Sequence, residues 1–175
     1  RGVTPYNSPD PIAVIDPDIA SKVGKFDLAS TLQSSPIAAG STQITAAISS
    51  NFVTDGGPGA QTINLRGLGP NRTLVLLNGR RAGPAGTRGG VSAFDLNVLP
   101  QSIAESVEIL KTGASSVYGS DAVAGVVNIK TKTSTNGLEL NGTVSAPFGG
   151  GGEEYRINAI WGKTFSRGHI LIAGD

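Results

Sequence analysis

The sequence predicts an α+β domain, with a small mixed sheet and short helices, followed by antiparallel strands that have one apolar face. Short apolar runs alternate with turns, because 25 of the 175 residues are glycine and 10 are proline. Before Pro36, Asp16 and Pro17 form a helix start signal, and Leu28 and Leu32 have the i, i+4 spacing of a helix face. Beyond Gly137, apolar and polar residues alternate with the period of a strand.

One strand and two short helices are predicted in the N-terminal part of the chain. PIAVI, residues 11–15, is a short apolar run of strand length. Asp16 stands at an N-cap position before Pro17, and Gly24 ends the helix that starts there. FDLASTLQSS predicts a second short helix, which ends before the following proline.

The middle of the chain predicts two pairs of strands. TINLRGLG and RTLVLLNGRR are interpreted as two strands, and Asn78–Gly79 is a strong hairpin-turn signal. LNVLPQSIAE, residues 96–105, predicts a turn and a short helix. SVEILKTGASSVYGSDAVAGVVNIKTK, residues 106–132, then predicts a strand, a turn with glycine and a second strand.

The strand that begins at residue 106 carries charges among its apolar residues. Alternation puts Val107, Ile109 and Lys111 on one side, and Glu108 and Leu110 on the other. Each side therefore has both apolar and charged residues. This pattern predicts a strand with protein on both faces, whose charges meet partners from another element.

The last strands are one-sided. Leu138, Leu140 and Val144 share a face, while Glu139 and Thr143 share the other, and alternation resumes around Trp161. Such strands fit a barrel wall that faces lipid, with aromatic residues near its edges, or an amphipathic hairpin of a soluble sandwich. Composition leaves both interpretations open.

Composition excludes several kinds of site. The chain has no cysteine, a single histidine, His169, and a net charge of +1. Disulfides, thiolate or multi-histidine metal sites, and a basic nucleic-acid-binding face are therefore not expected. We find no nucleophile with a base beside it, and the glycines of GLGPNR fail the dinucleotide fingerprint. The sequence predicts no enzyme activity and no cofactor.

Two segments together resemble a known family. INLRGLGPNRTLVLLNGRR and LNVLPQSIAESVEILKTGASSVYGSDAVAGVVNIKTK are similar, in this order, to the plug domain of TonB-dependent outer-membrane receptors. The resemblance implies a plug domain over residues 1–133 and the first antiparallel strands of a transmembrane β-barrel over residues 134–175. The remaining strands are expected beyond Asp175, and the segment that binds TonB upstream of Arg1.

The resemblance also implies function, location and partners. Plug domains fill the lumen of a barrel of about 22 strands in the bacterial outer membrane. The implied function is uptake of a scarce small nutrient, such as a siderophore, a cobalamin-like compound or a glycan, energised by TonB with ExbB and ExbD. Further partners are lipid, lipopolysaccharide and the rest of the barrel. The alternative is a plug fragment that transports nothing and serves as a structural component of a larger outer-membrane assembly.

The family pattern implies roles for particular residues. Arg66, Glu108 and Lys111 match positions where the plug contacts the barrel. Lys111 stands where the family usually has arginine, and a lysine keeps the charge but loses the bidentate fork. The loop of residues 78–90 would lie on the apical side of the plug. Ordinary solvated side chains are an equally good interpretation of its candidate ligand-binding residues, which are Asn78, Arg80, Arg81 and Arg88.

Overall fold

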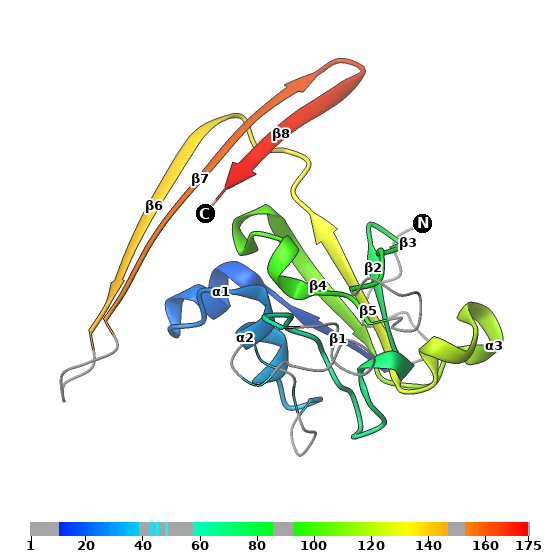
Figure 1. Ribbon diagram of the computed structural model, residues 1–175. Helices are drawn as coiled ribbons and strands as arrows, with labels where there is room; N and C mark the ends of the chain where they lie inside the picture. The colour runs from blue at the N-terminus through cyan, green and yellow to red at the C-terminus, as the bar shows by residue number, and fades with distance from the viewer. Residues whose placement is uncertain are drawn as a thin grey trace. The chain divides into compact units, whose positions relative to one another are not determined.

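The computed structural model describes residues 11–38, 43, 45, 48, 58–85, 93–146 and 153–174. Two compact units divide the chain, one reaching Thr131 and the other starting at Lys132 (Figure 1). None of the helices in these described ranges has the length and apolar character needed to cross a membrane. The two units are described separately.

A five-stranded mixed sheet organises the first unit. Its strand order is β1-β4-β5-β2-β3, and only β2 and β5 are parallel to each other. The expectation of a small mixed sheet is confirmed. The bounds of the strands are β1 Ile12–Ile15, β2 Thr73–Leu77, β3 Arg80–Arg81, β4 Ala104–Leu110 and β5 Gly125–Thr131.

Short helices connect these strands. The Asp16 carboxylate accepts from the first turn of α1 (Pro17–Lys22), and Asp27 does the same for α2 (Leu28–Gln33). Both N-terminal helices are therefore confirmed, and the first has the N-cap that the sequence indicates. The other helices are a single turn each: η1 Pro70–Arg72, η2 Leu96–Val98, η3 Gln101–Ile103, α3 Ser115–Tyr118 and η4 Ser120–Ala122.

The main core lies on the face of the sheet that packs against α2. Val107 and Ile109 of β4 stand opposite Ile129 and Val127 of β5, so the four side chains point to the same side. All four have no exposed surface. They pack in one cluster with further buried residues of α2 and the segments before β2 and β4, which include Leu28, Leu32, Ile63, Leu65 and Leu96.

The opposite face of the sheet has a smaller apolar cluster. Leu74 and Leu76 of β2 and Val126 of β5 pack with Ala114 and Ala122, and Leu110 contacts them. Part of the cover that the sequence predicts for the second face of β4 thus comes from the segment between β4 and β5. Leu110 packs against this cluster and is half-buried, as is Glu108.

Two sequence expectations differ from the structure. TINL, residues 62–65, is buried but forms a single bridge at Thr62 in place of a strand. Side chains satisfy its backbone, since the amides of Asn64 and Leu65 donate to Gln43 Oε1 at 2.9 Å and Thr73 Oγ1 at 3.1 Å. LNVLPQSIAE contains two 3₁₀ turns, and its last residues already belong to β4.

The second unit is a three-stranded antiparallel sheet in the order β6-β7-β8. Directly paired residues share a face, so Leu140 stands beside Ala159, and Trp161 lies between Leu138 and Ile172. The apolar face is exposed in these strands, with 66% of Leu140, 78% of Ile157 and 63% of Ile172 accessible. The bounds are β6 Gly137–Ser145, β7 Glu154–Phe165 and β8 Gly168–Gly174.

Gly125, the first residue of β5, gives a stability prediction. Its φ is +144°, and an added Cβ would lie 2.7 Å from the carbonyl oxygen of Leu110 and 3.0 Å from Leu65 Cδ1. We expect Gly125→Ala to destabilise the β4–β5 pairing by about 2 kcal/mol or more, because a backbone atom cannot move aside as a flexible side chain does. Hydrogen exchange of β4 and β5 amides in the intact protein measures the loss.

Gly24→Ala is the matched control for this substitution. Gly24 has a φ of +83° but nothing within 4 Å of an added Cβ. It should therefore show only the backbone strain, about 1 kcal/mol, and leave β4 and β5 protected. Equal exchange in the two variants would contradict the packing role of Gly125.

Candidate functional site

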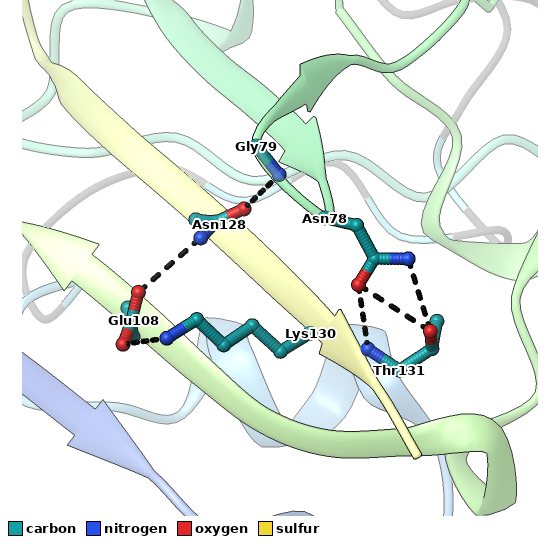
Figure 2. A network of polar contacts seen from close by, with 6 residues as sticks. All are labelled: Asn78, Gly79, Glu108, Asn128, Lys130 and Thr131. Carbon is teal, nitrogen blue, oxygen red and sulfur yellow. Dashed lines mark hydrogen bonds and ion pairs between the residues drawn. The ribbon is translucent and has the colours of Figure 1, made fainter. Parts of the chain in front are cut away.

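The candidate site starts at the turn between β2 and β3. Asn78 has a φ of +51° and Gly79 of +79°, the left-handed pair that a two-residue hairpin turn requires. The Asn78 side chain is bonded to the end of β5, since its Oδ1 accepts from the Thr131 amide at 3.0 Å and its Nδ2 donates to Thr131 Oγ1 at 2.9 Å. The hairpin turn is therefore fixed to the last residue of the first unit (Figure 2).

Asn128 connects this turn with β4. Its Oδ1 accepts from the Gly79 amide at 2.9 Å, and its Nδ2 donates to Glu108 Oε2 at 3.2 Å. Figure 2 shows this side chain on β5, between the turn and Glu108. Both ends of one amide are used, so β4, β5 and the β2–β3 hairpin are joined across the sheet.

Glu108 has its charge partner in the same sheet. Lys130 Nζ lies 2.5 Å from Glu108 Oε1, and 41% of the lysine side chain and 23% of the glutamate side chain are exposed. We expected this charge to meet a partner from another element, and the structure provides one from β5. Lys130, Asn128 and Thr131 were missed because their role depends on strand register, although alternation already places Asn128 and Lys130 on one face.

A second polar contact holds the segment that precedes β5. The Arg81 guanidinium forms an ion pair with Asp121 and also donates to the carbonyl oxygen of Tyr118. The hydrogen bond with Asp121 raises the pKa of Arg81, and the same bond lowers the pKa of Asp121. The stabilisation is thus present above the ordinary carboxyl pKa and is lost as the pH falls through the lowered value.

The two polar contacts hold opposite ends of the sheet. Because β2 and β5 are parallel, Asn78, which follows β2, and Thr131, which ends β5, lie at the same end of the sheet, whereas Asp121 precedes the start of β5. Arg81 reaches back from β3 toward that start. The arrangement can therefore hold the connections at both ends of the sheet in fixed positions.

The remaining predicted residues are exposed. Arg66 occupies a turn with a φ of +58°, Lys111 follows β4, and Arg80 lies in β3. Among the residues that the structure describes, none of these three side chains forms an ion pair. Arg88 lies outside the described residues.

A groove lies beside the exposed Arg80. It has a volume of about 580 Å³ and is lined on its apolar side by Leu77, Phe94, Val98 and Leu99. Asn78 and Arg81 also line it, but their side chains are engaged by Thr131 and Asp121. In the described part of the chain, no three histidine, cysteine or acidic side chains gather as a metal site would require.

The sequence and structure are both similar to known receptors. The family described as TonB-dependent Receptor Plug Domain matches residues 4–126. A protein of Acinetobacter baumannii named "Probable TonB-dependent siderophore receptor PirA" is 40% identical over 91 residues, which are 47% of this chain and 11% of that protein. The vitamin B12 transporter BtuB of Vibrio vulnificus is 34% identical over 121 residues, 68% of this chain and 19% of the transporter.

Solved structures agree with the observed fold. The siderophore receptor PirA from Acinetobacter baumannii has a TM-score of 0.58 at 25% identity, over 86% of this chain and 22% of that receptor. A ferric enterobactin receptor of Pseudomonas aeruginosa, crystallised with enterobactin, has a TM-score of 0.60 at 23% identity, over 91% of this chain and 23% of that one.

The family match and the fold lead to one assignment. The match covers most of the first unit, and the mixed sheet precedes antiparallel strands in the order that the resemblance implies. This chain spans 11% and 19% of the two curated relatives. The chain belongs to the TonB-dependent receptor plug domain family.

Proposed function

We propose that this chain is the plug and the first barrel strands of an outer-membrane receptor that takes up a scarce small nutrient. The observation that carries the proposal is the family match over residues 4–126, followed by a sheet with one exposed apolar face. A wall of alternating strands is one of the few structures that can satisfy its backbone in lipid. Side chains such as Leu140 and Ile157 would contact the lipid.

The relatives suggest the class of ligand. One is named a siderophore receptor and the other a vitamin B12 transporter, so we propose a siderophore or a cobalamin-like compound. Energy would come from TonB with ExbB and ExbD on the periplasmic side. Lipopolysaccharide and the remaining barrel strands would be further partners.

The exposed cations have proposed roles under this function. Arg66 and Lys111 are candidates for contacts with carboxylates of the remaining barrel strands, because neither forms an ion pair among the described residues. Glu108 stays a candidate for the same contacts, although it already has Lys130. Arg80 is the candidate for the ligand, because its guanidinium is exposed beside an apolar groove wall.

Uptake measurements test the proposed function. We expect deletion of the gene for the full-length protein to abolish cellular uptake of either a ferric siderophore or cobalamin. Loss of TonB should abolish the same uptake. If uptake of all tested ligands continues while an outer-membrane complex is lost, the chain instead serves a structural role in that assembly.

Arg80 gives a more specific prediction. Arg80→Ala in the full-length receptor should weaken ligand binding by about tenfold to a hundredfold, the effect of losing a charged hydrogen bond. The control is Lys22→Ala, which removes a surface charge at the end of α1 and should leave affinity unchanged. Calorimetry on the purified receptor measures both, and an unchanged affinity in Arg80→Ala would remove Arg80 from the ligand site.

A further inference from the structure

The chain turns where the linker, residues 132–136, enters β6. Gly137 begins the strand with a φ of +105°, a conformation that residues with a Cβ rarely adopt. Its direct partner in β7 is Gly162, so two glycines face each other where the linker meets the sheet. Positive φ explains the glycine at 137 but not the one at 162.

The linker explains the glycine at position 162. A Cβ added to Gly162 would lie 2.5 Å from the carbonyl oxygen of Thr135 and 2.9 Å from its Cβ. Such distances are too short for real atoms, so only glycine leaves room for the linker backbone here. The linker therefore lies directly on β7, on the side that Glu139 and Asn141 share with Gly137.

Asn136 adds a polar contact at the same place. Its Oδ1 accepts a hydrogen bond from the Thr164 amide at 2.8 Å. Thr164 lies two residues beyond the last pair between β6 and β7, where the pairing has already ended. The side chain thus satisfies a backbone donor that the neighbouring strand no longer reaches.

Other glycines of this sheet show that the close approach is specific. Gly142 of β6 and Gly174 of β8 have nothing within 4 Å of an added Cβ. Like Gly162, neither of them has a positive φ. Of these three glycines, only Gly162 has the linker backbone packed against it.

We propose that residues 132–136 form a strap bound to β7. The strap backbone packs directly on Gly162, and the Asn136 side chain accepts the hydrogen bond from the Thr164 amide. The strap makes residues 132–136 a fixed part of the second unit. Without these contacts, the same residues could change conformation independently of β7. Under the proposed function, any rearrangement of the plug during transport would then be confined to residues that precede Lys132 in the sequence. This consequence rests on the proposed function, whereas the strap itself does not.

Hydrogen exchange on the full-length protein tests the strap. We expect the Thr164 amide to be protected in the wild-type protein, because it donates to Asn136 Oδ1. Gly162→Ala should speed its exchange by about tenfold, because the added methyl group displaces the linker backbone that positions Asn136. Gly142→Ala, the matched control in the same hairpin, should leave it unchanged. An unprotected Thr164 amide in the wild type, or equal exchange in the two variants, would overturn the proposal.

Asn136→Ala is a second variant that introduces no clash. It should speed exchange of the Thr164 amide about threefold to tenfold, as expected for one lost hydrogen bond. This variant keeps the proposal testable if Gly162→Ala does not assemble. Unchanged exchange at Thr164 would show that the Asn136 side chain does not hold the strap on β7. None of these exchange measurements depends on uptake, so they separate failure of the strap from failure of the proposed function.

Discussion

The side-chain amide of Asn128 is the contact on which the arrangement of the first unit depends. It lies on β5 and bonds Glu108 of β4 on one side and the Gly79 amide on the other. An aspartate here would place a second carboxylate against Glu108, and a leucine would leave the Gly79 amide without this acceptor and Glu108 with Lys130 alone. One uncharged polar side chain therefore links three chain segments (Figure 2).

This contact makes the two faces of the sheet different. Val107, Ile109 and their neighbours form a buried apolar face, while Glu108, Asn128 and Lys130 form a polar row on the other. The row is half-buried and internally paired, so a second layer of protein can cover it without leaving a charge alone. Such a face suits the interior of a larger structure, which agrees with the proposed place of a plug.

Much of the fold could be predicted, because local signals and tertiary contacts agree. Asp16 and Pro17 mark a helix start, and Asn78–Gly79 marks a hairpin, since each depends only on neighbouring residues. The alternation around Leu140 predicts the exposed apolar face. TINL was wrongly predicted as a strand because side chains distant in sequence, such as that of Gln43, satisfy its backbone. The pairing of Glu108 with Lys130 depends on the register of β4 and β5, and the pairing of Arg81 with Asp121 depends on the turn before β5. Hydrophobic periodicity predicts neither the register nor the turn.

Under the proposed function, the plug sheet precedes a strand wall that faces lipid. Quenching of a fluorophore by lipid-attached spin labels, on the full-length protein in bilayers, tests this claim directly. A probe at Ile157, whose side chain is 78% exposed, should be quenched strongly. A probe at Thr143, on the opposite face of β6, should be quenched weakly. Equal lipid quenching at the two positions, or quenching of both by a water-soluble agent alone, would contradict a strand wall that faces lipid.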